Sequence, residues 1–270
     1  MATGGEIASL LLVGAGKMGG ALLQAWLDRG FDAARIHVLE PQPAPRIAAL
    51  CAARGVALGL PATPPSVLVL AIKPQALDEV AAALAPIMRQ DTLVISVLAG
   101  KTIQNLAQRL PGAIVRAMPN LAAAVGSGIT AAVASDSVTP AQKHTADALL
   151  AAVGRVEWLS DESLINAATA VSGSGPAYVF YLGECLATAG VAAGLPRDLA
   201  TRLARATIEG AGALLARQPD VSSAELRASV TSPGGTTAAA LAVLSGEAGL
   251  ETLIVDAVAA AKRRAQELSG

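Results

Sequence analysis

Hydroxyl and glycine residues gather in the stretch VTSPGGTTAAALAVL, residues 230–244, of a chain that has only two histidines. Pro233 and the glycines after it predict a turn, and Thr236 and Thr237 fall at the first turn of an alanine- and leucine-rich helix. Backbone N–H groups at a helix start would hold a carboxylate, and the hydroxyls would supply one hydrogen-bond donor. The alternative is an ordinary capping loop.

The side chains available for acid–base chemistry narrow the reaction. His37 lies inside an expected strand and His144 in an expected polar helix, so we expect both to be structural. This excludes a Ser-His-Asp hydrolase, and no Asp/Glu cluster offers a metal site. Hydroxyls, backbone amides and Lys73 remain. They suit hydride addition to a group that is easily protonated, such as an imine, where one donor near the nitrogen suffices.

A second group of residues has the spacing of a dinucleotide site. Gly14, Gly16 and Gly19 in LLLVGAGKMGGALL have G-x-G-x-x-G spacing, directly after an apolar run and at the start of a helical pattern. The first glycine permits a tight turn, the second lets the backbone approach a pyrophosphate, and the third lets the helix pack on the strand. The motif alone is weak, but this context favours dinucleotide binding over a purely structural turn.

The expected second strand, IHVL, ends at Glu40, where an acidic residue would bind the adenosine ribose 2′-OH. A carboxylate there favours NAD because it repels a 2′-phosphate. Arg46 follows closely and could instead attract a phosphate, so the cofactor preference stays open. Glu40 as a plain loop residue is the other interpretation.

Three more segments end at the same expected sheet edge. They carry Lys73 and Pro74 in AIKPQ, Ser96, Ala99 and Gly100 in SVLAG, and Met118, Pro119 and Asn120 in RAMPN. Ligands of open α/β sheets bind at the carboxyl ends of the strands, which favours a nicotinamide pocket over simple turn chemistry.

The elements that position these residues follow from the apolar pattern. Uninterrupted apolar runs alternating with helical patterns predict a doubly wound, mostly parallel sheet. The expected strands are residues 9–14, 36–39, 66–72, 92–98, 113–118, 128–135 and 155–160, and helices are expected at 17–30, 44–55, 76–88 and 102–110. After residue 160 only helices are expected, at 161–170, 176–193, 196–218, 223–230 and 249–268. This predicts an α/β Rossmann domain at 1–160 and an all-α domain at 161–270.

The helical half is rich in alanine and glycine on nearly every face. Helices of this kind must be buried, and so short a segment cannot bury them all against itself, which predicts a homo-oligomer over a tightly packed monomeric bundle.

The composition excludes several classes of protein. The net charge of −1 and the lack of a long Lys/Arg run disfavour nucleic-acid binding. No apolar run approaches membrane-spanning length, and the N-terminus has no basic start of a signal peptide or anchor. Cys51 and Cys185 are too few for a disulfide framework, so we expect core thiols in a cytoplasmic protein.

The motifs VGAGKMGGAL, AIKPQ, SVLAGKTI, RAMPN, VSGSGPAYVFYLGECLATAGVAAGLPRDLATRLA and VTSPGGTTAAALAVL together resemble the pyrroline-5-carboxylate reductase family over essentially the whole chain. The last two motifs are far more specific than the glycine fingerprint. The resemblance implies an NADPH- or NADH-dependent oxidoreductase that reduces a cyclic imino acid to proline, in proline biosynthesis. It also implies a Rossmann domain and a helical dimerisation domain whose homodimers can form decamers.

Site residues follow from the same resemblance. Ser232, Gly235 and Thr236 would bind the substrate carboxylate, and Thr237 would bind the imine nitrogen as the catalytic proton donor or relay. The cofactor would contact Gly14, Ala15, Gly16, Lys17, Met18, Gly19, Ala71, Ile72, Lys73, Pro74, Ser96, Ala99 and Gly100. Glu40 joins these cofactor residues from its place at the end of the second strand, not from the resemblance.

Three features depart from the family pattern. LEPQP replaces the small hydroxyl or basic residues that many members carry after the second strand, which leaves NADPH against NADH open. GLPATPPS is short and lacks an Asn that can contact the ribose, and Ala228 and Ser229 replace an acidic residue and an Asn or Gln.

Two alternatives remain. A β-hydroxyacid dehydrogenase would need a catalytic lysine, which SLINAATAVSGSGPAYVF lacks, and a non-catalytic nucleotide sensor would not need an intact TSPGGTT.

Overall fold

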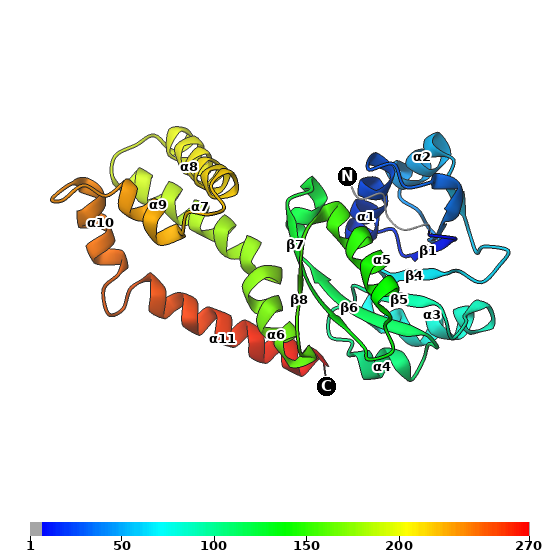
Figure 1. Cartoon of the computed structure of the whole chain (residues 1–270). Coiled ribbons are helices and arrows are strands. Elements are labelled where there is room, and N and C mark those ends of the chain that lie inside the picture. Colours follow the sequence, from blue (N-terminus) through cyan, green and yellow to red (C-terminus); the bar gives the residue numbers. More distant parts are fainter. Residues whose placement is uncertain (1–6, 270) are drawn as a thin grey trace. The chain divides into compact units, whose positions relative to one another are not determined.

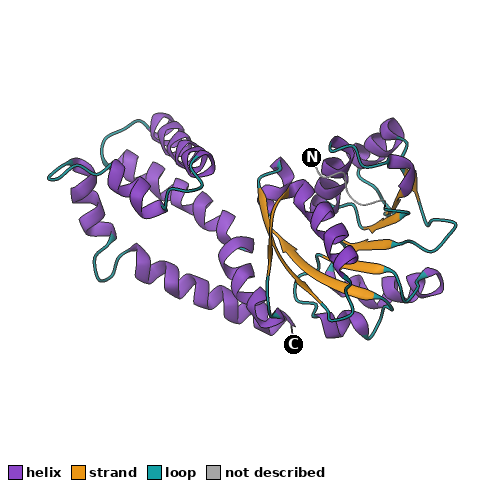
Figure 2. Cartoon of the chain, viewed as in Figure 1, coloured by secondary structure: helices purple, strands orange, loops and turns teal. Residues whose placement is uncertain are grey.

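A computed structural model describes residues 7–269. The segment expected to carry no signal peptide begins in residues 1–6, which lie outside the described part. The described chain contains a mostly parallel sheet, whose strands are orange in Figure 2. The strand order is β3-β2-β1-β4-β5-β6-β7-β8. Its strands are β1 (Leu10–Val13), β2 (Ile36–Leu39), β3 (Ala57–Leu58), β4 (Val67–Leu70), β5 (Leu93–Ser96), β6 (Ala113–Pro119), β7 (Gly128–Ala134) and β8 (Gly154–Trp158). Neighbouring strands are parallel from β3 to β6, β7 runs antiparallel to β6, and β8 is parallel to β7.

Helices cover both faces of this sheet (Figure 1). They are α1 (Lys17–Asp28), α2 (Pro45–Arg54), α3 (Leu77–Leu84), α4 (Ile103–Ala107) and α5 (Pro140–Leu150), with short 3-10 turns η1 (Ala33–Arg35), η2 (Pro74–Ala76), η3 (Ala85–Ile87), η4 (Leu121–Val125) and η5 (Ala151–Val153). Helices α1, α2 and α5 share one apolar core with the sheet, and α3 and α4 share the other. Strands covered on both faces must be apolar at every position, which is why β1 reads LLLV and β4 reads VLVL.

The sheet topology creates one edge suited to a ligand. Strand β1 lies between β2 and β4, so the chain order reverses direction across the β1–β4 pair. The carboxyl ends of the parallel strands meet at this edge, and a crevice forms at such a reversal in open α/β sheets.

The chain leaves the sheet through an irregular helical segment. It consists of η6 (Glu162–Leu164), α6 (Ile165–Ala168) and the π-helix η7 (Thr169–Gly173). A single α-helix over 161–170 is therefore not what forms, and the five-residue π-turn TAVSG ends in the first two residues of the SGSG motif. π-Turns of this kind occur often at functional sites.

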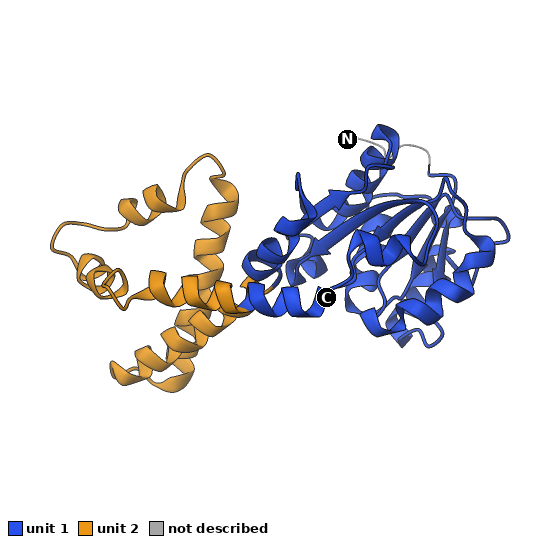
Figure 3. Cartoon of the chain, turned by 90° about the horizontal axis from the view of Figure 1, so that it is seen from below, with its two compact units in different colours: residues 1–173, 261–270 blue, residues 174–260 orange. Residues whose placement is uncertain are grey.

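The remaining helices are α7 (Gly175–Ala192), α8 (Arg197–Arg217), α9 (Ser223–Ser229), α10 (Thr236–Leu244) and α11 (Leu250–Ser269). The chain divides into two compact units, coloured in Figure 3. Unit 1 comprises the described residues up to Gly173 and those from Ala261 onward, and unit 2 comprises Ser174–Ala260. Helix α11 thus contributes its last turns to unit 1.

The fold class expected from the sequence is confirmed: a doubly wound, mostly parallel Rossmann-type sheet with an all-α C-terminal part. The short exposed strand β3 was not expected. The domain boundary at 160/161 stays a prediction.

Candidate functional site

The turn between β1 and α1 is shaped by two glycines that the protein's own packing requires. Gly14 has φ +87°, and its N–H donates to Leu39 O at 3.0 Å. A Cβ on Gly14 would lie 2.7 Å from the carbonyl oxygen of Ala71, and one on Gly19 would overlap the carbonyl oxygen of Gly14. These two glycines bring the ends of β1, β2 and β4 into close contact with α1.

Gly16 has a different environment. No described atom lies within 4 Å of a Cβ placed on it, and its φ of −66° is open to any residue. It is the N-cap of α1, where no described side chain caps the helix and no acidic residue occupies the first turn. The N–H groups of this helix start are therefore available to an anion, and the missing side chain leaves space for a pyrophosphate.

Glu40 lies at the carboxyl end of β2 and is attached to the glycine turn. Its Oε2 accepts a hydrogen bond from the Ala15 N–H at 3.0 Å, and its Oε1 accepts one from the Gln42 N–H at 3.3 Å. Glu40 therefore has a structural role besides any contact with a ribose.

The segment after β4 lies directly beside this turn. The Ala71 N–H donates to Val13 O at 2.8 Å, which extends the β1–β4 pairing by one residue. Ile72 is half-buried and Lys73 is exposed, and Pro74 begins η2. An exposed lysine thus lies one strand away from the glycine turn.

The segment after β5 is more enclosed. Ser96 is fully buried, and its Oγ accepts a hydrogen bond from the Leu98 N–H at 3.3 Å. Ala99 is exposed. Gly100 has φ +70°, and a Cβ on it would overlap the carbonyl oxygen of Leu268 from α11. Packing within unit 1 thus accounts for both Ser96 and Gly100, whether or not they contact a cofactor.

A groove of about 790 Å³ runs along the outer side of α1. Its wall includes Gly16, Lys17, Met18 and Arg46, and it continues past Gln24. Three exposed basic side chains, Lys17, Arg29 and Arg46, therefore share this groove with the glycine turn.

In unit 2, the loop before α10 is a tight turn. The Gly235 N–H donates to Ser232 O at 3.0 Å, and Gly234 has φ +70°. Proline second and a positive-φ glycine third in such a turn are the type II pattern. A Cβ on Gly235 would lie 2.5 Å from the Ser232 hydroxyl, so glycine is what lets that hydroxyl approach the helix start.

The start of α10 follows this turn. Gly235 is its N-cap, no described side chain caps it, and no acidic residue lies in its first turn. Ser232 and Thr236 are exposed and Thr237 is half-buried. Exposed N–H groups, two accessible hydroxyls and one sheltered hydroxyl are what a small carboxylate with an adjacent polar atom would need.

Helix α9 leads into this loop, and hydrogen bonds fix it at both of its ends. Ser222 and Glu225 form a capping box, in which Glu225 Oε2 accepts from the Ser222 N–H at 2.8 Å. The hydrogen bonds from the Ser222 hydroxyl and then from its backbone N–H lower the pKa of the Glu225 carboxyl. The Thr231 hydroxyl donates to Arg227 O at 2.6 Å, which ties the loop to the end of α9.

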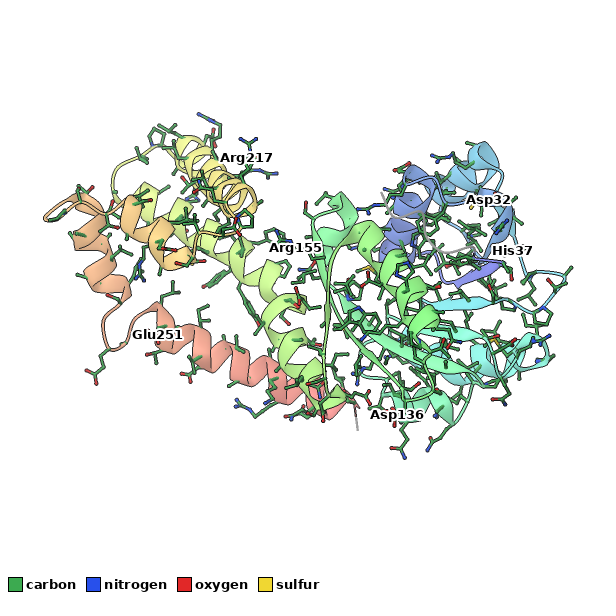
Figure 4. All side chains as sticks on the ribbon, in the orientation of Figure 1. Asp32, His37, Asp136, Arg155, Arg217 and Glu251 are labelled. Atoms are coloured by element: carbon green, nitrogen blue, oxygen red, sulfur yellow. The ribbon has the colours of Figure 1, made fainter. Side chains whose placement is uncertain are left out.

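The two histidines lie away from the strand ends. His37 is in β2 (Figure 4), and its Nδ1 is buried without a hydrogen-bond partner among the described residues. His144 is exposed on α5. Within residues 7–269, no three His, Cys, Asp or Glu residues come together in a way that could hold a metal ion. None of the described helices is long and apolar enough to cross a membrane.

The sequence did not reveal a buried ion pair. Arg116 in β6 is 2% exposed, and its Nη1 lies 2.6 Å from Glu162 Oε1. The same oxygen accepts the Ile103 N–H at 2.9 Å, so it joins η6, α4 and β6. The signal was the arginine inside the apolar run AIVRAM, but nothing in the sequence names its partner.

Family models match both parts of the chain. A model described as pyrroline-5-carboxylate reductase dimerisation matches residues 162–268, and one described as NADP oxidoreductase coenzyme F420-dependent matches residues 9–100.

Individual relatives match over nearly the full length. A pyrroline-5-carboxylate reductase of Pseudomonas aeruginosa is 40% identical over 265 residues, covering 96% of each chain. The structure of a pyrroline-5-carboxylate reductase from Coxiella burnetii matches with a TM-score of 0.90 at 35% identity, covering 98% of this chain and 100% of that one. A Plasmodium falciparum pyrroline carboxylate reductase with NADP bound matches with a TM-score of 0.79 at 26% identity, covering 98% and 99%.

The glycine turn at the β1–β4 reversal and these relatives define the class of protein: an NAD(P)H-dependent oxidoreductase with a Rossmann domain. Within that class, the chain belongs to the pyrroline-5-carboxylate reductase family.

Proposed function

We propose that this protein reduces L-1-pyrroline-5-carboxylate to L-proline with NADPH or NADH, the last step of proline biosynthesis. The observation that carries the proposal is the Ser232–Thr237 turn at the start of α10, which offers N–H groups and hydroxyls together in a chain of this family. Reduction adds a hydride to the imine carbon and a proton to the nitrogen, so the C=N bond becomes a C–N single bond.

The residues of unit 1 fit a dinucleotide. The bound nicotinamide would supply the hydride. We infer that the turn from Gly14 to Gly19 binds the pyrophosphate through the N–H groups of α1, where Gly16 leaves space. We assign the nicotinamide and its ribose to the strand ends carrying Ala71, Ile72, Lys73, Pro74, Ser96, Ala99 and Gly100.

In unit 2, we assign the substrate carboxylate to the start of α10, with Ser232, Gly235 and Thr236 as its partners. Thr237 comes next on the helix and is half-buried, which shields its hydroxyl from competing water. It would donate a hydrogen bond to the ring nitrogen, as the proton source or as a relay.

We propose that residues 1–160 form the nucleotide domain and 161–270 the helical domain for substrate binding and assembly. Unit 2 supports a homodimer, which further pairing could extend to a decamer, because its helices expose many large apolar side chains. Cys51 is buried as expected, whereas Cys185 is exposed, so the expectation of two core thiols is wrong for Cys185. The unpaired state of both thiols supports a cytoplasmic location.

The test is turnover of pyrroline-5-carboxylate with NADPH or NADH, followed by nucleotide absorbance. We expect Thr237→Ala to lower kcat by about 10- to 1,000-fold, because one positioned donor is lost. Thr237→Ser keeps a hydroxyl and should retain most of the rate.

The outcomes separate the alternatives. No imine turnover with either nucleotide would overturn the proposal, and oxidation of 3-hydroxyacids with NAD⁺ would favour a β-hydroxyacid dehydrogenase. Nucleotide binding without any turnover would indicate a sensor. An unchanged kcat in Thr237→Ala would show that solvent or an already protonated iminium supplies the proton.

A further inference from the structure

We propose that Glu40 makes the nucleotide site selective for NADH over NADPH. This inference rests on the proposed function only in taking the site to bind a nicotinamide dinucleotide. It concerns a residue of this chain, whereas one relative is described with NADP bound.

The carboxylate of Glu40 is held in place at the end of β2. Each of its two oxygens accepts a hydrogen bond from a backbone N–H group, that of Ala15 in the glycine turn and that of Gln42 in the loop after β2. Glu40 is half-buried. A side chain fixed at both oxygens cannot swing away from a ligand without losing these hydrogen bonds.

The position of this carboxylate determines which part of the dinucleotide it contacts. The glycine turn is where the pyrophosphate fits, and the end of β2 is where the adenosine ribose lies in sheets of this topology. The hydroxyls of an unmodified ribose donate hydrogen bonds, and a carboxylate is an acceptor with lone pairs to spare. NADH therefore gains charge-assisted hydrogen bonds here.

A 2′-phosphate reverses the sign of the interaction. A phosphate monoester carries a charge of about −2 at neutral pH, and its oxygens are acceptors. The N–H of Ala15, which could have served such a phosphate, already donates to Glu40. NADPH would therefore place like charges together and lose a donor.

The exposed cations that line the groove along α1 are Lys17 at the start of α1, Arg46 at the start of α2, and Arg29 just past the far end of α1. Among the described ion pairs, none of the three neutralises Glu40. A flexible, exposed arginine attracts a phosphate weakly compared with the repulsion of a fixed carboxylate at the ribose. Arg46 is therefore the residue to substitute in order to measure how much a cation at this site favours NADPH.

The experiment measures dissociation constants of NADH and NADPH for the full-length protein by calorimetric titration without imine. We expect the wild type to bind NADH ~10-fold or more tightly than NADPH. Glu40→Ser should reverse or abolish this ratio, chiefly by tightening NADPH binding. Arg46→Ala should weaken NADPH further and leave NADH within about twofold, and Glu79→Gln, an exposed acid on α3, should leave both constants unchanged.

A second variant tests whether the effect of Glu40→Ser comes from a loss of structure in the turn. Glu40→Gln keeps an oxygen that can accept from Ala15 while removing the charge, so it should narrow the NADH:NADPH ratio with an unchanged melting temperature. Equal or tighter binding of NADPH by the wild type, or an unchanged ratio in both Glu40 variants, would overturn the inference. Failure to bind either nucleotide would overturn it together with the proposed function. NADH selectivity without imine reduction would overturn only the proposed function.

Discussion

At the residue scale, the glycines of the β1–α1 turn differ in what their missing side chains allow. Gly14 and Gly19 make room for parts of the protein itself, the carbonyl oxygens of Ala71 and Gly14. No described atom occupies the space beside Gly16, although its backbone conformation suits any residue. Space kept free at a helix start is evidence for a ligand, which spacing in the sequence alone cannot provide.

This difference predicts opposite results from the same substitution. Gly16→Ala should leave the melting temperature unchanged and weaken dinucleotide binding by about tenfold or more, because the added methyl group would occupy the space that the pyrophosphate needs. Gly19→Ala should destabilise the fold by about 1–3 kcal/mol through overpacking against Gly14. Thermal melts and nucleotide titrations of both variants check this, and a Gly19→Ala protein as stable as Gly16→Ala would contradict it.

At the element scale, Glu162 holds the segment that leaves the sheet. Its carboxylate pairs with Arg116 and caps Ile103, while Arg116 Nε has no described hydrogen-bond partner. Glu162→Ala should cost about 3 kcal/mol of unfolding free energy, because it leaves a buried guanidinium unpaired.

Denaturant titration measures this loss, with Glu157→Ala on β8 as the control, since Glu157 is exposed. The double variant Arg116→Met with Glu162→Ala should recover part of the stability. Equal stability of the Glu162→Ala and Glu157→Ala proteins would show that the ion pair contributes nothing.

How far the elements could be predicted depends on burial. Strands such as β1 and β4 are enclosed on both faces, so their sequences are uninterrupted apolar runs. Strand β3 consists of two exposed residues, so its sequence shows no recognisable pattern. The π-turn in η7 changes the hydrogen-bond register within a helical pattern, which side-chain periodicity does not record. The glycine spacing predicted the turn, but the bond from Ala15 to Glu40 depends on side-chain placement, so the sequence left the role of Glu40 open.

At the scale of the whole molecule, unit 2 has few buried side chains of its own. Helices α7, α9 and α10 contain no fully buried residue, and α8 contains only Ala200 and Ala204. Phe180 is 60% exposed and Leu253 is 62% exposed. Apolar surface on this scale marks an interface between chains.

We therefore expect analytical ultracentrifugation to give a mass that is a multiple of the 26.9 kDa chain. Phe180→Asp and Leu253→Asp should each shift the protein toward monomer, because a charge would be buried in the interface. Val125→Asp is the matched control, since this valine is 78% exposed on η4 in unit 1. A wild-type monomer at micromolar concentration would contradict the expectation.

Helix α11 also has a consequence for synthesis. The turns from Ala261 onward belong to unit 1, where the Leu268 backbone fills the space that Gly100 leaves open. Residues 174–260, all of unit 2, are translated between the sheet and these turns. Chains emerge from the ribosome N-terminus first. Unit 1 therefore lacks the last turns of α11 until all of unit 2 has been synthesised.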